Sequence, residues 1–228
     1  MSRYVVVAIA LAACTGDVDP QWQLAHDRVI AVRATPPGIG SGEVAQIDAL
    51  LGFKDQPPAE GEPDMAVVVS PTSLQGALTQ QSTGWTVTEP PDDQLAAART
   101  ELGLAADAPV PLQLQLTFAF DGLVALKGVM LGQHADNPVL DPITIDGMDA
   151  VTQTQLSVPA GVDVPLVVDF DDTYNINWLT SCGTMHDFDL ASAYLVVGST
   201  DPQSGTLAIV VRDDQGGVAW QVWPISAQ

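Results

Sequence analysis

The 228-residue sequence predicts an all-β protein, made of two antiparallel β-sandwiches in tandem with one short helix inserted in the first. Three observations favour this fold class. Apolar and polar residues alternate in several short segments, turns rich in Gly and Pro separate these segments, and the order of segments in the first half recurs in the second.

The first sandwich is expected to begin with strands at residues 28–34 and 44–51, separated by the turns Pro36-Pro37-Gly38 and Gly40-Ser41-Gly42. We interpret Gly38–Gly42 (GIGSG) as a turn that opens no helix and so cradles no phosphate. Further strands are predicted at 65–70 and 84–90, with irregular chain at 54–64 and 71–83.

One helix is predicted in the segment DDQLAAARTELGL (92–104). Asp92 or Asp93 can cap its first turn, Ala and Leu fill it, and Gly103 ends it. The helix lies in a long connection, residues 52–110, that exceeds what a compact sandwich needs. We interpret this connection as an insertion in the first sandwich.

Residues 111–132 give the clearest hairpin, with Leu112 to Phe120 alternating before an Asp121-Gly122 turn. The second half is expected to contain strands within 154–170, 174–179 and 191–199 and a second hairpin at 205–225. Both hairpins place a glycine turn before Val-Ala and an alternating strand, which is a weak internal repeat. The resulting division is 1–13 signal peptide, 14–27 tether, 28–135 first sandwich and 136–228 second sandwich.

The first fourteen residues predict export. Arg3 precedes an uncharged run from Tyr4 to Ala13, which is too short to span a membrane. The run ends Leu11-Ala12-Ala13-Cys14 and resembles the lipobox of bacterial lipoproteins. That resemblance implies a lipidated Cys14 that anchors the mature chain in the cell envelope. Thr15, where an Asp would signal inner-membrane retention, favours the outer membrane. An ordinary signal peptide with an incidental cysteine is the alternative.

The composition excludes some partners. Seven Lys and Arg stand against 28 Asp and Glu, for a net charge of −21, so we expect no nucleic-acid partner. The other cysteine, Cys182, would have no intrachain partner once Cys14 carries lipid, so the fold has to rely on its core.

Four stretches of the chain together resemble uncharacterised lipoproteins of myxobacterial type. They are the lipobox and the segments RVIAVRATPPGIGSGEVAQIDALL, NWLTSCGTM and IVVRDDQGGVAWQVWPI. The last segment is similar to the final hairpin of polycystic-kidney-type and immunoglobulin-like repeats. The resemblance implies immunoglobulin-like sandwiches and an envelope location, and it carries no activity with it.

Candidate metal ligands follow from that resemblance, because immunoglobulin-like and cadherin-like repeats often bind calcium at domain ends. Five carboxylates stand in two segments that are expected to form neighbouring loops, and calcium takes six to eight oxygen ligands. No contiguous calcium loop is present, and a solvated acidic loop is the alternative. The five are Asp169, Asp171, Asp172, Asp187 and Asp189.

Two further candidate sites are weighed against simpler interpretations. Trp220 and Trp223 should face opposite sides of one strand, so one of them could offer an exposed ring to a glycan or a protein. Cys182 and His186 could pair as a nucleophile and its base, but a small buried thiol beside a turn is the simpler interpretation.

The sequence therefore predicts no cofactor, with calcium as a candidate, and a non-enzymatic, lipid-anchored binding or structural module. Its expected partners are the membrane, through the anchor, and an envelope protein or glycan. The alternatives are a calcium-dependent adhesion or glycan-binding module and, less favoured, a thiol-dependent enzyme.

Overall fold

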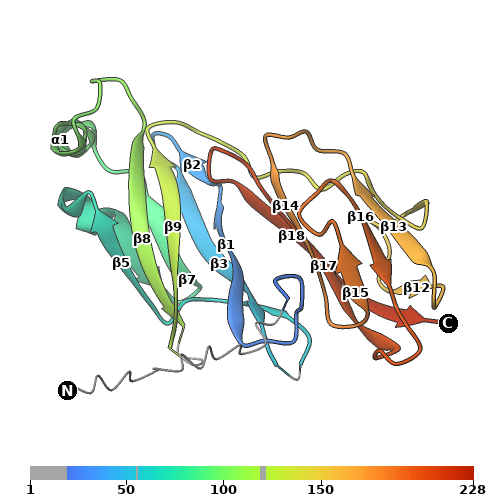
Figure 1. Cartoon of the computed structure of the whole chain (residues 1–228). Coiled ribbons are helices and arrows are strands. Elements are labelled where there is room, and N and C mark those ends of the chain that lie inside the picture. The colour runs from blue at the N-terminus through green and yellow to red at the C-terminus, as the bar shows by residue number, and fades with distance from the viewer. Residues whose placement is uncertain (1–19, 55, 119–121) are drawn as a thin grey trace, which may run out of the picture.

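The computed structural model describes residues 20–54, 56–118 and 122–228. The signal peptide and Cys14 lie outside the described residues, as does Asp121 of the first predicted hairpin turn. The described chain forms two β-sandwiches side by side, the first running from blue to yellow-green and the second from yellow to red (Figure 1). No helix in these ranges has the length and apolarity needed to cross a membrane.

The first sandwich comprises strands β1 to β9. Their bounds are β1 Arg28–Thr35, β2 Gly38–Ile39, β3 Val44–Gly52, β4 Ala59–Gly61, β5 Met65–Ser70, β6 Leu78–Gln81, β7 Gly84–Thr88, β8 Val110–Phe118 and β9 Leu123–Leu131. One sheet has the order β1-β3-β7-β6, with β4 beside β3, and the facing sheet has the order β2-β9-β8-β5.

The second sandwich comprises strands β10 to β18. Their bounds are β10 Ile143–Ile145, β11 Met148–Asp149, β12 Leu156–Val158, β13 Asp163–Val168, β14 Asn175–Thr180, β15 Thr184–His186, β16 Ser192–Val196, β17 Ser204–Arg212 and β18 Val218–Ala227. Its sheets have the orders β11-β10-β13-β16-β15 and β12-β18-β17-β14.

The two sandwiches share one topology. In each, the first strand pairs in one sheet, and a short strand then crosses to the other sheet and runs parallel to the last strand, as β2 does with β9 and β12 with β18. The sheet orders correspond to the ABED and CFG sheets of immunoglobulin domains. The predicted fold class, two tandem immunoglobulin-like antiparallel sandwiches, is confirmed.

Gly38 and Ile39 correct one prediction, because they form the crossing strand β2 rather than a turn alone. Position 38 has no room for a side chain, because a Cβ atom there would lie 2.6 Å from the carbonyl oxygen of Gln133. Alternation could not reveal a two-residue strand.

The connection in the first sandwich holds the helix α1, Asp92–Leu102, which lies between β7 and β8. It buries Leu95 and Ala98 in the first core and ends at Gly103, whose φ of 67° suits glycine. The predicted cap is wrong, since Pro91 is the N-cap and the two aspartates lie in the first turn, where the helix dipole favours them.

Residues 71–83 are more ordered than predicted. They contain the 3-10 helix η1, Thr72–Ala77, and then β6. The buried residues of η1 are Leu74 and Ala77, three positions apart, which is the spacing that a 3-10 turn places on one side. Similarly, β4 lies in the predicted loop 54–64 and pairs with β3.

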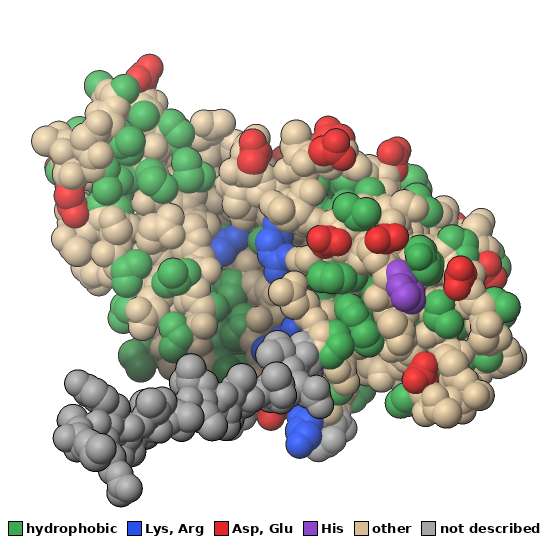
Figure 2. Space-filling model, in the orientation of Figure 1, with side chains coloured by type: hydrophobic (Ala, Val, Ile, Leu, Met, Phe, Trp, Pro, Cys, Tyr) green, Lys and Arg blue, Asp and Glu red, His purple; other side chains and the backbone are tan. Residues whose placement is uncertain are grey.

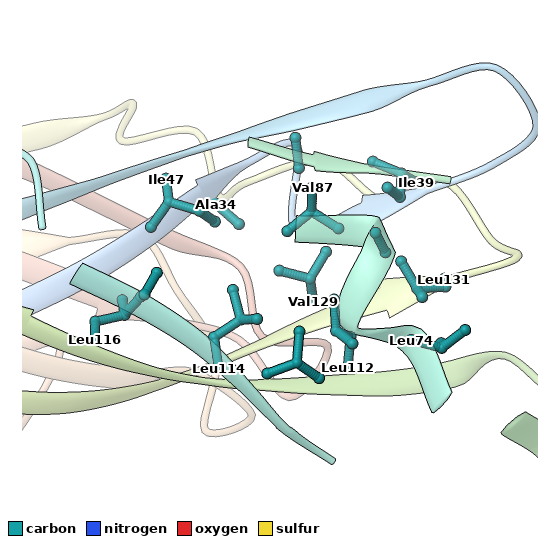
Figure 3. Close-up of a cluster of buried hydrophobic side chains, with 14 of the residues drawn as sticks. Ala34, Ile39, Ile47, Leu74, Val87, Leu112, Leu114, Leu116, Val129 and Leu131 are labelled. Carbon is teal, nitrogen blue, oxygen red and sulfur yellow. The ribbon is translucent and has the colours of Figure 1, made fainter. Parts of the chain in front are cut away.

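Each sandwich has its own core. The first is built largely on the predicted alternation of β8, whose Leu112, Leu114, Leu116 and Phe118 are buried in one cluster with side chains of β3 and β7. Figure 3 shows the three leucines with Ile47 of β3 and Val87 of β7. The second core contains Trp178 and Trp223. Burying such side chains stabilises a fold by about 1.5–3 kcal/mol each.

The predicted tether is shorter than expected. Thr180 donates its backbone N–H to Trp22 and accepts one from Leu24, so this segment extends the edge of β14. Trp22 packs against the second core. The chain therefore contacts the second sandwich before it forms the first.

Candidate functional site

The most structured feature outside the two cores is the joint between the sandwiches. A third cluster of apolar side chains lies there, contributed by β1 and β3 on one side and β14, β17 and β18 on the other. Its buried members are Leu24, Ala31, Leu50, Leu179, Ala208, Val210, Val218 and Trp220. Because β17 is covered on both faces, Leu207 to Val211 form one continuous buried run.

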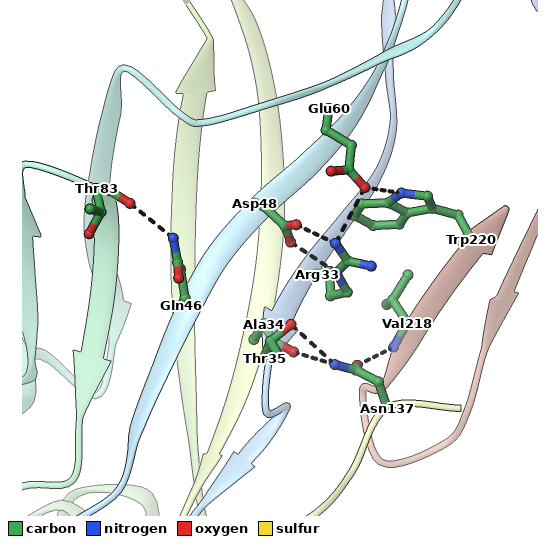
Figure 4. A network of polar contacts seen from close by, with 10 residues as sticks. All are labelled: Arg33, Ala34, Thr35, Gln46, Asp48, Glu60, Thr83, Asn137, Val218 and Trp220. Atoms are coloured by element: carbon green, nitrogen blue, oxygen red, sulfur yellow. Dashed lines mark hydrogen bonds and ion pairs between the residues drawn. The ribbon is translucent and has the colours of Figure 1, made fainter. Parts of the chain in front are cut away.

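Polar contacts border this cluster (Figure 4). Arg33 donates Nε to Asp48 Oδ1 at 3.1 Å and Nη2 to Asp48 Oδ2, so the guanidinium binds the carboxylate through two hydrogen bonds. The same guanidinium lies 3.9 Å from the ring centre of Trp220, whose Nε1 donates to Glu60 Oε1 at 2.9 Å. The joint thus fixes an aromatic ring of one sandwich on a charged pair of the other.

Asn137 connects the sandwiches from the segment between them (Figure 4). Its Nδ2 donates to the carbonyl of Ala34 at 2.9 Å, and its Oδ1 accepts the N–H of Val218 at 2.8 Å. One amide side chain therefore satisfies a backbone group on each side of the joint.

Two cations cross the joint as well. Arg212 of β17 donates to the carbonyl of Ile30 at 2.9 Å, and Ile30 has no paired residue in β3 because the register of β1 shifts there. Lys127 of β9 donates Nζ to the carbonyl of Gly216 at 2.5 Å. Burial lowers the pKa of Lys127 to about 8, partly offset by Asp213 and Asp48, and burial also lowers the pKa of Arg212.

The structure corrects the proposal that Trp220 or Trp223 offers an exposed ring. The two do lie on opposite faces of β18, but both faces are covered. Trp223 is 0% exposed in the second core, with Nε1 donating to the carbonyl of Ala150, and Trp220 is 8% exposed in the joint. The alternation of β18 was visible in the sequence; the second covering layer was not.

The five predicted calcium ligands lie on exposed positions of two adjacent loops, where the backbone N–H of Val168 donates to the carbonyl of Ala191. Asp171 accepts hydrogen bonds from Thr173, which lower its pKa. Within the described ranges, no three His, Cys, Asp or Glu side chains gather closely enough to hold a metal ion. The loops are neighbours, but Asp169, Asp171, Asp172, Asp187 and Asp189 do not converge.

Cys182 and His186 are separated by the sheet. Cys182 is 1% exposed in the second core, beside the Thr180 hydroxyl, and burial raises the pKa of its thiol. His186 points outward and stacks on Tyr194 with ring centres 4.9 Å apart. The structure therefore agrees with the simpler interpretation, in which Cys182 is a small buried thiol, and Cys182 does not pair with His186.

One sheet face of the first sandwich remains uncovered by the described chain. On the outer side of β5, β8 and β9 the register aligns Met65 with Thr117 and Val124, and Val67 with Gln115 and Leu126. The flanking side chains are apolar and exposed, from 41% at Val67 to 69% at Leu126. Contiguous exposed apolar side chains of this kind are typical of interaction surfaces.

Apart from Trp220, the residues of the joint were not predicted from the sequence. Two signals could have found them. The run Leu207–Val211 is apolar without alternation, which indicates burial of both faces, and Lys127 falls on the inward side of a predicted alternating strand. A lysine at an inward position indicates a partner that lies outside its own sandwich.

Comparison with known proteins gave no match to any family model and none to any curated protein. Solved structures that match part of the chain include a nucleoside hydrolase-related hypothetical protein from Saccharophagus degradans, at 18% identity and a TM-score of 0.33. The match covers 41% of this chain and 26% of that protein's length.

Two further structures match along most of the chain. The N-terminal Ig1-2 module of the Drosophila receptor protein tyrosine phosphatase DLAR has 14% identity and a TM-score of 0.28, with 87% of this chain and 98% of that one covered. Murine CEACAM1b has 12% identity and a TM-score of 0.27, with 87% and 100% covered. At these values the comparisons assign no family, and the strand topology itself establishes the fold.

Proposed function

We propose that this chain is a non-catalytic binding module of the cell envelope, anchored by lipid at Cys14, that presents the outer face of β5, β8 and β9 to a protein partner. The observation that carries the proposal is the contact between the two sandwiches of the molecule itself. The corresponding face of the second sandwich, on β14, β17 and β18, already docks a sheet face of the first.

The exposed face has the chemistry that such docking uses. Apolar side chains on β5 and β9 flank a middle strand with Gln115 and Thr117, so a partner can bury the flanks and hydrogen-bond the centre. The joint supports presentation of this face as part of a rigid unit, because Asn137, Arg212 and Lys127 each hydrogen-bond across it.

The anchor rests on the Leu11-Ala12-Ala13-Cys14 motif, which lies outside the described residues. We expect Cys14→Ser to release the protein from envelope fractions, because two or more acyl chains are needed for stable membrane binding. A C14S protein that stays bound as tightly as wild type would refute the anchor and leave the binding face to be tested separately.

The binding face is tested with two matched valines. Val67 on β5 and Val167 on β13 are both 41% exposed, on different sandwiches. In crosslinking of envelope preparations, Val67→Lys should remove the adduct that wild type forms, and Val167→Lys should retain it. Adducts that persist in V67K, or that are lost equally in both variants, would place the partner elsewhere.

Sedimentation of the purified chain identifies one specific partner. If wild type and V167K self-associate and V67K does not, the protein that occupies the face is a second copy, which pairs the same face of both molecules. A monomer that still gives the V67K-sensitive adduct has a different envelope protein as its partner.

A further inference from the structure

The hollow between the two sandwiches gathers positive charge on an acidic molecule. Figure 2 shows Lys and Arg side chains where the two halves meet, while Asp and Glu side chains are scattered over the rest of that face. Arg28, Lys127 and Arg212 line a cleft of about 550 Å³ at this place. The whole sequence holds only seven Lys and Arg, so their concentration here is a property of the fold.

The cleft has the dimensions and the walls of a small-molecule site. Ligand pockets have volumes of about 300–1,000 Å³ and are mostly apolar with a few polar groups. Here the apolar wall comes from β1 and β9, including Val29, Val32 and Ala125. A second cavity of about 260 Å³ shares Arg28, Ile30 and Arg212 with the first, so the two are adjacent.

The cations in the cleft are incompletely neutralised. Asp213 is the carboxylate that lines the same cleft, and it already accepts backbone N–H groups from Gln215 and Gly217. Lys127 and Arg212 donate to uncharged oxygens. Burial lowers the pKa of Arg28, which is the expected result when desolvation of a cation is not offset by a nearby anion.

Arg28 carries two hydrogen-bond donors without partners in the part of the chain that the structure describes. Its Nη1 donates to the carbonyl of Gln21, but within the described residues its buried Nε and Nη2 have no hydrogen-bond partner. These two N–H groups form one fork of the guanidinium. In Arg33 the same two nitrogens bind the carboxylate of Asp48, so the molecule itself contains the occupied form of this fork.

We propose that the cleft between the sandwiches binds a small organic carboxylate, whose two oxygens accept Nε–H and Nη2–H of Arg28 and whose apolar body lies along β1 and β9. A single free fork matches a planar pair of oxygens. Lys127 and Arg212 already have hydrogen-bond partners, so they attract the ligand through their positive electrostatic potential rather than through direct contacts. A phosphate group needs several free donors, so this arrangement disfavours it.

Calorimetry of the purified full chain with octanoate at pH 7 tests the proposal. Octanoate should bind, acetate should bind at least tenfold more weakly because it lacks the apolar body, and octan-1-ol should not bind because it lacks the charge. Inorganic phosphate should bind more weakly than octanoate.

Variants of Arg28 distinguish the effect of the guanidinium fork on binding from the effect of the positive charge. Arg28→Lys keeps the positive charge and loses the fork, and it should weaken octanoate binding by about tenfold to a hundredfold. Arg28→Gln should do the same or more. Arg99→Lys is the control, since Arg99 is a half-buried arginine that donates Nε to the carbonyl of Ala108, outside the cleft.

Urea unfolding of each variant shows that the fold is intact. Unchanged octanoate affinity in R28K, equal binding of octan-1-ol, equal or tighter binding of phosphate, or no binding of octanoate to wild type would each overturn the proposal. Loss of binding in R99K with the same magnitude would overturn the role of Arg28.

Discussion

The two sandwiches have the same strand topology but differ in what covers one sheet. In the second sandwich, the sheet with β14, β17 and β18 packs its inner side on the core and its outer side on the first sandwich. In the first sandwich, the matching sheet with β5, β8 and β9 packs on one side, and its outer side is exposed. Equal topology therefore does not imply equal surroundings.

The middle strands of the two sheets, β8 and β17, differ in sequence according to what covers their outer faces. On β17 the outward positions hold Ala208 and Val210, whereas on β8 they hold Gln115 and Thr117. A sheet covered on both faces produces a continuous apolar run, and one covered on a single face produces alternation. When two related domains differ in this way, the strand that lacks apolar–polar alternation indicates which sheet face docks on another domain.

The largest effect is expected from placing a charge in the joint. Ala208→Asp should reduce the free energy of unfolding by roughly 3–5 kcal/mol, because the charge would be buried among the apolar side chains of the joint without a partner. Val67→Asp on the exposed face should cost about 1 kcal/mol or less, the span of strand propensities. Urea unfolding of both variants measures the contrast, and equal losses would contradict the difference in burial.

The second effect concerns the charge of Lys127. Its pKa of about 8 in the folded state lies below the ordinary value of 10.5, so the unfolded state binds more protons between these values and stability should rise with pH there. The rise attributable to Lys127 is roughly 3 kcal/mol. Lys127→Met removes the penalty, so it should be more stable than wild type at pH 7, with a difference that shrinks towards pH 10.

Unfolding curves of both proteins at pH 7, 8.5 and 10 measure this difference directly. Asp213 and Asp48 raise the pKa of Lys127 and Arg212 lowers it. A constant difference between the two proteins across this range would show that Lys127 does not titrate there.

The third effect concerns the amide that connects the sandwiches. Asn137→Ala should cost about 1–3 kcal/mol, because the N–H of Val218 and the carbonyl of Ala34 lose their shared partner. Asn175→Ala on the exposed start of β14 should change stability by less than about 0.5 kcal/mol. Hydrogen exchange at the Val218 amide should become faster in N137A alone.

The smallest effect is expected at the indole hydrogen bond. Trp220→Phe keeps an aromatic ring near Arg33 but removes the Nε1–H donated to Glu60, and it should cost about 0.5–1.5 kcal/mol. Glu60→Gln keeps an acceptor and should cost less. A W220F protein as stable as wild type would show that solvent replaces this contact fully.

The sequence predicted the tandem sandwiches, the strands of both hairpins and the helix with its Gly103 end, because those features depend on local alternation and on turn residues. It could not predict β2, β4 or β6, whose two to four residues are too short for a periodic signal. The lipid anchor at Cys14, the envelope location and calcium binding remain predictions.

By itself, the sequence determined which residues face a core, because the period of two in strands assigns alternate side chains to opposite faces. Only the tertiary structure decided what lies on the second face. The joint brings Arg28, Lys127 and Arg212 to one cleft from strands that are far apart along the chain, and it buries Trp220 against Arg33. Contacts between sheet faces depend on how two finished sandwiches dock, and no local pattern encodes that arrangement.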